Sequence, residues 1–235
     1  GQLIPPGSLV LDLMTSWVSH LPPELGLAGV AGLGMNQVEL EQNPVLTERI
    51  VQDLNRDPVL PWSDATFDAA VVTVSVQYLT SPEKVFAEVG RVLKPGAPFA
   101  VAYSNRCFPT KAIRGWLQTD DHGRIELVRR YFTASGAFDE PVAATRVPAA
   151  RGADPLHAVW ATASAAAPSR PRSGLVTTHT GIDRRSSANR PLSSKLRRNA
   201  APGPGRRRTS GAMPPAMKIP PVATTVRATL PASAP

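Results

Sequence analysis

Three features are scarce or missing in this chain, and each absence excludes a class of protein. With one cysteine, Cys107, the 235 residues cannot form an internal disulfide or a cysteine-rich zinc site. No apolar run reaches the roughly 18 residues that a membrane-spanning helix needs, and we therefore expect no membrane partner. Residues 14–25, which follow the first apolar run, contain no glycine. This excludes the usual glycine-rich turn that lets a backbone approach a bound nucleotide closely.

Charge and aromatic content divide the chain near residue 163. Residues 1–163 hold 13 Lys and Arg against 17 Asp and Glu, a net charge of −4, together with every Phe, Trp and Tyr. Residues 164–235 hold 13 basic residues against one acid, a net charge of +12, with 11 of the 25 prolines. Such a segment buries too little apolar surface to offset its chain entropy. The sequence predicts a folded α/β domain over 1–163 and a disordered, basic Pro/Ala/Ser/Arg-rich tail over 164–235.

Two interpretations of the tail stay open. The basic runs 196–198 and 206–208 would neutralise phosphates, which predicts a binder of nucleic acid or of another anionic surface. The composition also fits translation of GC-rich sequence past a natural end near Ala163, and we favour this interpretation because the tail has no aromatic residue for base stacking. Nucleic acid is therefore a possible partner only through the tail.

The N-terminal residues bear on location. Residues 2–13 lack the basic region and cleavage site of a signal peptide, so we expect a cytoplasmic protein. The chain begins with Gly1 rather than Met, which indicates a fragment or a processed product and leaves import into an organelle open.

Apolar runs alternate with helix signals along residues 1–163. The sequence predicts strands over 9–13, 27–33, 49–52, 67–74 and 97–103, helices over 81–93 and 124–134, and a closing antiparallel hairpin of 142–147 and 156–161. Ser81 and Pro82 are typical of a helix start, and Gly136 of a helix end. Strands separated by helices predict a Rossmann-like, doubly wound and mostly parallel sheet.

Two blocks resemble a known family. Asp-Ala-Thr-Phe-Asp-Ala-Ala-Val at 64–71 and Glu-Val-Gly-Arg-Val-Leu-Lys-Pro-Gly-Ala at 88–97 are similar to class I S-adenosylmethionine-dependent methyltransferases with a "type 11" methyltransferase domain. The similarity covers residues 8–163. Residues 10–22 and 104–111 further resemble an uncharacterised methyltransferase-like subgroup, whose members usually extend further at the N-terminus.

The resemblance implies S-adenosylmethionine as cofactor and a cofactor loop after the first strand. Asp12 matches the acid that organises this loop, while Met14, Ser16 and Val18 stand where the family usually has three glycines. A β-branched residue such as Val18 resists a positive φ. The pair Pro22-Pro23 is expected to shorten the following helix to a turn or two.

The resemblance implies further contacts after the second, third and fourth strands. Gly34 stands where the family has an acid that binds the ribose hydroxyls, and Asn36 offers only a weaker replacement. Asp53 matches the acid that binds the adenine amino group, with the Leu54 backbone as the adjacent donor. Ser75 follows the fourth strand, where cofactor and substrate meet in the family.

Some of these residues have a structural interpretation as well. Asp12 would also cap the following turn, Asn36 is favoured as a turn residue, and Asp53 would also serve as a loop carboxylate beside Arg56. The tryptophans at 17 and 62 would line a pocket or, as we favour, pack in the core. The four histidines show no metal-ligand spacing, so we predict no metal site and identify no catalytic base.

The sequence thus predicts a methyltransferase that transfers a methyl group from S-adenosylmethionine to an unidentified acceptor. One alternative is a non-catalytic methyltransferase-like domain that serves protein interaction, because the loop glycines and the ribose acid are missing. The other alternative is a nucleic-acid or anionic-surface binder that acts through the tail. The oligomeric state is left open.

Overall fold

The computed structural model describes residues 3–148 and 153–165. The chain divides into two units, residues 1–176 and 177–235, and every described residue belongs to the first. The prediction of a disordered tail over 164–235 therefore lies, beyond residue 165, outside the described residues.

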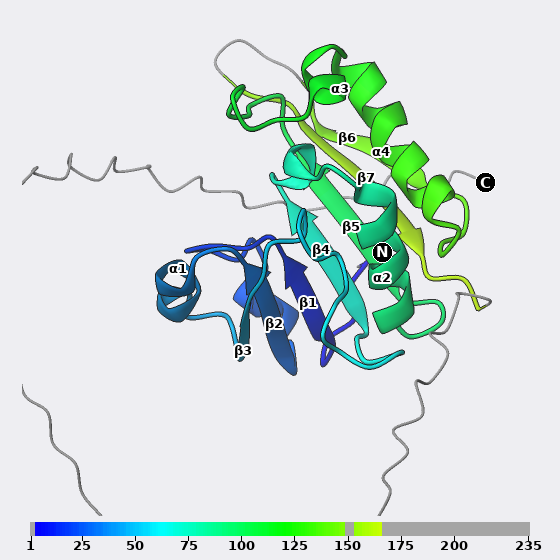
Figure 1. The fold of residues 1–235 in the computed structure, drawn as a ribbon. Coiled ribbons are helices and arrows are strands. Elements are labelled where there is room, and N and C mark those ends of the chain that lie inside the picture. Colours follow the sequence, from blue (N-terminus) through cyan, green and yellow to red (C-terminus); the bar gives the residue numbers. More distant parts are fainter. Residues whose placement is uncertain (1–2, 149–152, 166–235) are drawn as a thin grey trace, which may run out of the picture. The chain divides into compact units, whose positions relative to one another are not determined.

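One seven-stranded sheet organises the described residues, in the order β3-β2-β1-β4-β5-β7-β6 (Figure 1). The strands are β1 (Leu9–Leu13), β2 (Gly29–Gly34), β3 (Glu48–Val51), β4 (Ala69–Thr73), β5 (Pro98–Tyr103), β6 (Val142–Val147) and β7 (Leu156–Thr162). Strands β1 to β5 pair in parallel, whereas β7 pairs antiparallel with both β5 and β6. The predicted Rossmann-like, mostly parallel sheet with a closing hairpin is confirmed.

Two long helices cover one face of the sheet, α2 (Pro82–Val92) and α4 (Asp121–Ser135) (Figure 1). The apolar face of α2 is buried, and Phe86 lies at the centre of an aromatic cluster. Its ring centroid is 4.9 Å from those of Phe99 on β5 and Phe132 on α4, in edge-on geometry. Such pairs add about 0.5–1.5 kcal/mol each to the burial of the rings.

The helix ends follow local signals, with one correction. Pro82 begins α2 as predicted, although the Ser81 side chain makes no capping hydrogen bond. Helix α4 begins three residues before its predicted start because the Asp120 side chain accepts a hydrogen bond from the Gly123 backbone at 2.8 Å. Gly136, at φ 65°, ends α4 in the left-handed conformation that glycine tolerates.

The other face of the sheet is covered, at β1 and β2, by short segments. Its core contains Val10 and Val30 from the strands and Leu21, Leu40 and Leu46 from the connections. Between β1 and β2 the chain forms only the 3-10 helix η1 (Pro23–Leu25), which confirms the predicted shortening. The helix between β2 and β3, α1 (Gln37–Gln42), has six residues. This half of the sheet is therefore held mostly by loops.

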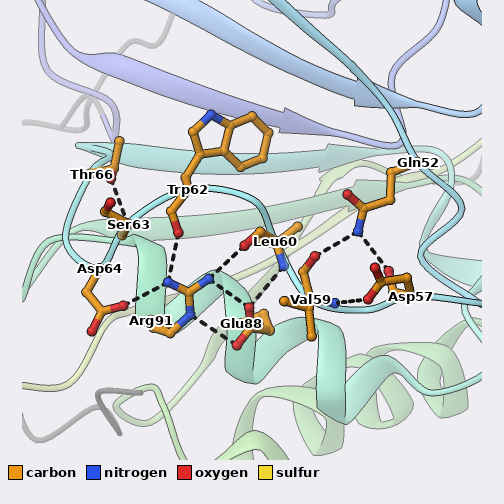
Figure 2. A network of polar contacts seen from close by, with 10 residues as sticks. All are labelled: Gln52, Asp57, Val59, Leu60, Trp62, Ser63, Asp64, Thr66, Glu88 and Arg91. Carbon is orange, nitrogen blue, oxygen red and sulfur yellow. Dashed lines mark hydrogen bonds and ion pairs between the residues drawn. The ribbon is translucent and has the colours of Figure 1, made fainter. Parts of the chain in front are cut away.

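No helix connects β3 to β4, and the buried guanidinium of Arg91 on α2 fixes this connection instead (Figure 2). Arg91 donates to the Leu60 and Trp62 carbonyls at 2.9 Å and forms ion pairs of 2.8 Å with Asp64 and Glu88. Glu88 also accepts a hydrogen bond from the Leu60 backbone at 3.0 Å. The hydrogen bond to Glu88 raises the pKa of Arg91.

A second group of contacts holds the start of the same connection. The amide of Gln52 donates to the carbonyls of Asp57 and Val59, both at 2.8 Å (Figure 2). Trp62 packs edge-on against Phe67 at 5.2 Å and donates to Glu48, so the packing interpretation is right for Trp62. Trp17 is 48% exposed, and the same interpretation is wrong for it, because the loop after β1 has no helix under which to bury the ring.

Candidate functional site

A hollow opens where the strand order reverses, between the carboxyl ends of β1 and β4. In open α/β sheets, connections leave in opposite directions at such a point and create a crevice for ligands. Here the hollow has a volume of about 150 Å³. It is lined by Asp12, Met14, Thr15, Ser16, Val18 and His20 on the β1 side and by Thr73, Val74 and Ser75 on the β4 side. Four of the predicted cofactor residues, Asp12, Met14, Ser16 and Ser75, therefore meet in one place.

Asp12 organises the loop after β1. Its carboxylate is buried and accepts a hydrogen bond from the Ser19 hydroxyl at 2.6 Å, which folds the loop back over the strand end. Burial raises the pKa of Asp12, while the hydrogen bond from Ser19 acts in the opposite direction. A polar group in this position is costly unless it is bonded, so the Ser19 contact is part of the loop's structure.

Asn43 also holds this loop in place, and the sequence did not predict this role. This fully buried amide follows α1 and donates to the Ser16 carbonyl at 2.9 Å and to the Ser19 hydroxyl at 3.3 Å. Its own oxygen accepts a hydrogen bond from the Val45 backbone at 3.1 Å. The Asn-Pro pair at 43–44 indicates only a turn, and no sequence signal connects it to a loop 24 residues earlier.

Two residues of the hollow have backbones in the left-handed region. Met14 has φ 56° and Val74 has φ 50°. Such conformations cost about 1–3 kcal/mol for a residue other than glycine and concentrate at functional sites. Of the three positions where the family has glycine, only Met14 adopts a positive φ; Ser16 and Val18 do not. The expectation that Val18 resists this conformation is confirmed. Met14 adopts the conformation although it is not a glycine.

The end of β2 explains why no acid stands at the ribose position. A Cβ atom on Gly34 would collide with the backbone carbonyl oxygen of Thr15. The Thr15 amide in turn donates to the Leu33 carbonyl at 3.0 Å, so the loop lies directly against β2. The position can carry an acid only if this loop moves.

Asn36 is engaged in capping α1. Its side-chain oxygen accepts from the backbones of Val38 and Glu39 at 3.0 and 3.4 Å, and its amide donates to the Glu39 carboxylate at 2.8 Å. These contacts match the turn interpretation of Asn36. They leave its amide already bonded within the helix start.

Asp53 and Leu54 follow β3 and do not belong to the lining of the hollow. One Asp53 oxygen accepts a hydrogen bond from the Asn55 backbone at 3.0 Å, and Asp53 forms no ion pair with Arg56 or any other described residue. Leu54 is buried. Asn55 fixes this loop to the segment after β4: its amide donates to the Tyr78 carbonyl at 2.9 Å, and its oxygen accepts from the Thr80 backbone at 2.8 Å.

Side-chain hydrogen bonds to backbone carbonyls hold the segment after β4 in place. The Ser75 hydroxyl donates to the Thr73 carbonyl at 3.2 Å. Gln77, in the 3-10 helix η2 (Val76–Tyr78), is buried and donates to the Val74 carbonyl at 2.9 Å. These contacts hold the wall of the hollow in place. Nothing in this wall is an ionisable side chain, so Asp12 and His20 are the two ionisable groups of the lining.

A larger hollow of about 390 Å³ lies at the opposite edge, where the strands begin. Its charged groups are already paired: Lys94 contacts Asp68 at 2.6 Å, and Asp68 accepts from the Leu9 backbone at 2.9 Å. The hydrogen bond from Lys94 lowers the pKa of Asp68. Because its polar groups satisfy one another and it lies away from the switch point, we assign this hollow to the scaffold.

Comparison with known proteins gives the class. Residues 30–101 match the family model described as "Methyltransferase domain". This part of the chain is therefore similar to methyltransferase domains, in agreement with the resemblance stated from the sequence. The match begins in β2, after Asp12 and the loop that follows β1.

Two curated relatives share parts of the sequence. A demethylmenaquinone methyltransferase from Renibacterium salmoninarum is 33% identical over 102 residues, which are 41% of this chain and 41% of the relative. A sterol 4-C-methyltransferase from Caenorhabditis elegans is 45% identical over 42 residues, 18% of this chain and 13% of the relative. The chain thus matches less than half of the length of either relative.

Solved structures resemble the domain as well. An S-adenosylmethionine-dependent methyltransferase from Methanosarcina mazei has a TM-score of 0.48 at 20% identity, covering 69% of this chain and 95% of that one. One from Mesorhizobium loti has a TM-score of 0.48 at 17% identity, covering 67% and 91%. The fold assignment rests on the strand order itself.

Two further findings limit the kinds of site. Within residues 3–148 and 153–165, no three His, Cys, Asp or Glu side chains gather as metal ligands. In the same part of the chain, no helix is long and apolar enough to cross a membrane.

Proposed function

We propose that this protein transfers a methyl group from S-adenosylmethionine to an acceptor. The observation that carries the proposal is the hollow at the β1–β4 switch point, floored by the buried Asp12, in a domain of the methyltransferase family. The curated relatives are named as methyltransferases with two different acceptors, so the names do not define the acceptor of this chain.

The residues fit such a cofactor at two of three places. The loop that Asp12 organises would hold one end in the hollow, and Asp53 with the Leu54 backbone would hold the adenine. The hollow of about 150 Å³ is smaller than the ~300–1,000 Å³ usual for ligand sites, so part of the ligand would lie outside it, toward β2 and β3. At the ribose position the residues do not fit, since Gly34 has no room for a carboxylate.

The missing carboxylate predicts weak binding rather than none. A hydrogen bond to a charged group contributes about 1.5–3 kcal/mol, so affinity should be about tenfold to a hundredfold lower than with the acid. S-adenosylmethionine supplies an electrophilic sulfonium methyl group when it is bound. The chain's own task is then to align an acceptor beside it. If the acceptor must lose a proton, His20 is the exposed ionisable group of the lining, whereas Asp12 is buried and bonded to Ser19.

Calorimetric titration of the full chain with S-adenosylmethionine and S-adenosylhomocysteine tests the proposal. We expect saturable binding of both, reduced at least tenfold by Asp12→Asn, which removes the charge but keeps an acceptor for Ser19. The matched control is Asp68→Asn at the opposite edge, which should bind normally. Unfolding curves of each variant establish that it is folded. Absence of binding by folded wild-type protein, or equal effects of the two substitutions, would overturn the proposal.

A second candidate is a non-catalytic methyltransferase-like domain that serves protein interaction. The collision at Gly34 favours it, because the loop after β1 occupies space that a ribose-binding acid needs. The same titration separates the candidates: folded protein that binds neither ligand supports the interaction domain.

A further inference from the structure

Exposed apolar side chains are concentrated at one edge of the sheet. Among the described residues, the large apolar side chains that are exposed are Leu3, Trp17, Val18, Met35, Val38, Val51, Val74, Phe108, Leu117 and Val142. All except Leu3 and Val142 lie at or after the carboxyl ends of the five parallel strands. In strand order they run from Val51 at β3, through the loops after β2 and β1, to Val74 at β4 and to Phe108 and Leu117 after β5. Clustered apolar exposure marks an interaction surface.

The end of this row after β5 is also basic. Residues 108–117 expose Phe108 (68%) and Leu117 (45%) together with Lys111 and Arg114, at a spacing of three residues. The Lys111 ammonium lies 5.9 Å from the centre of the Phe108 ring. No described residue forms an ion pair with Lys111 or Arg114, and residues 104–119 contain no acid. Apolar groups and unpaired cations thus share one short segment.

Backbone hydrogen bonds and one buried side chain fix residues 108–117 to the rest of the domain. The Phe108 backbone donates to the Tyr78 hydroxyl at 3.0 Å, and the Ile113 backbone donates to the Gln77 carbonyl at 3.0 Å. Trp116, in the short helix α3 (Arg114–Leu117), is fully buried and packs edge-on against Tyr103 at 5.0 Å. α3 lies beside the N-terminal start of α4 (Figure 1).

We propose that the 108–117 segment docks on the surface of an anionic lipid bilayer. Phe108 and Leu117 would enter the interface, while Lys111 and Arg114 would contact the lipid headgroups. Charge complementarity selects this occupant: cations beside exposed aromatic and aliphatic groups suit an acidic membrane surface. Nucleic acid would use the cations but would leave the aliphatic side chains without partners. The sequence-based expectation of no membrane partner considered only spanning segments, and lying on a bilayer needs none.

The inference is independent of methyl transfer and needs a test that separates the segment from the basic residues 164–235. Cosedimentation of the full chain with phosphatidylcholine vesicles, with and without phosphatidylserine, measures binding. We expect binding to require phosphatidylserine. Phe108→Ser with Leu117→Ser should lower the partition coefficient at least tenfold without changing charge. Lys111→Gln with Arg114→Gln should lower it about twenty-five-fold at low salt, at about fivefold per cation.

The matched control is Val142→Ser with Arg146→Gln on β6, which removes one exposed apolar group and one exposed cation elsewhere. It should bind like wild type. Equal binding by wild type and the Phe108/Leu117 variant, or an equal loss in the control, would overturn the proposal. Binding to RNA that falls with the same Phe108 and Leu117 substitutions would assign the surface to nucleic acid instead.

A second measurement tests the proposal if the serine variants fail to fold. Phe108→Trp keeps an aromatic side chain at the exposed position. Its added fluorescence should be quenched by brominated lipids in phosphatidylserine vesicles. A new tryptophan signal that brominated lipids leave unchanged would show that the segment stays outside the bilayer, and the proposal would be wrong.

Discussion

The two halves of the sheet are built by different means. Around β4, β5 and β7, long helices and an aromatic cluster cover the strands, and both family blocks lie here. Around β1, β2 and β3, the cover consists of loops, a 3-10 turn and a six-residue helix, and the cofactor loop departs from the family at every glycine position. The match to the family model begins only after that loop. The half with long helices thus keeps both blocks of the family resemblance, whereas the half covered by loops differs from the family at the loop after β1.

Truncating one core side chain in each half should give the largest difference between the halves. Phe86→Ala removes a ring that contacts Phe99, Tyr131 and Phe132, and it should cost about 4 kcal/mol of unfolding free energy. Leu21→Ala, in the loop-covered half, should cost about 2 kcal/mol, since a loop can collapse around the cavity. Urea unfolding measures both. Equal losses would mean that the two halves are equally well packed.

The next effect concerns the end of β2. Gly34→Ala forces a Cβ atom against the Thr15 backbone and should cost about 2 kcal/mol. Gly115→Ala is the control, because there the added atom meets nothing within 4 Å. Gly34→Asp should be destabilised similarly and should gain no affinity for S-adenosylmethionine. A stable Gly34→Asp variant with tighter binding would show that the loop moves aside readily.

These differences also define what the sequence could predict. The strand β4, the helix α2 and the closing hairpin follow from local patterns, and each was predicted. The early start of α4 depends on one cap, Asp120, that hydrophobic periodicity does not detect. The loop after β1 depends on Asn43 and on the contact of Thr15 with β2, and tertiary contacts of this kind leave no local pattern.

A smaller effect is expected at Met14. Met14→Gly and Met14→Ala both remove the side chain, but only glycine adopts φ 56° without strain. The glycine variant should therefore be about 1 kcal/mol more stable than the alanine variant. Thermal unfolding of the pair provides the measurement. Equal stability would indicate that the loop relaxes out of the left-handed conformation when the side chain is lost.

The smallest effect contrasts two aspartates at opposite edges through pH. Burial raises the pKa of Asp12 in the folded protein. Protonation of Asp12 therefore favours the folded state. This contribution to stability is complete at pH values below the ordinary pKa of aspartate, and it is lost as the pH rises through the raised pKa. Asp12→Asn should gain stability relative to wild type from acid to neutral pH. Asp68, whose pKa is lowered by Lys94, contributes stability above its usual range that is lost on acidification.

Asp68→Asn should therefore show the opposite trend, losing stability relative to wild type as the pH rises. Urea unfolding of both variants across this pH range gives the two slopes. Parallel slopes would contradict the assignment of opposite environments to the two carboxylates.

The Arg91 network imposes a rule on insertions and deletions. Its contacts on the β3–β4 connection are the backbone carbonyls of Leu60 and Trp62 and the carboxylate of Asp64, so one short stretch surrounds the guanidinium (Figure 2). One residue inserted between Leu60 and Asp64 would shift these groups relative to one another. Arg91 could then keep only some of its contacts. We therefore expect insertions and deletions between Leu60 and Asp64 to destabilise the protein more than changes of length in loops that make no such contacts.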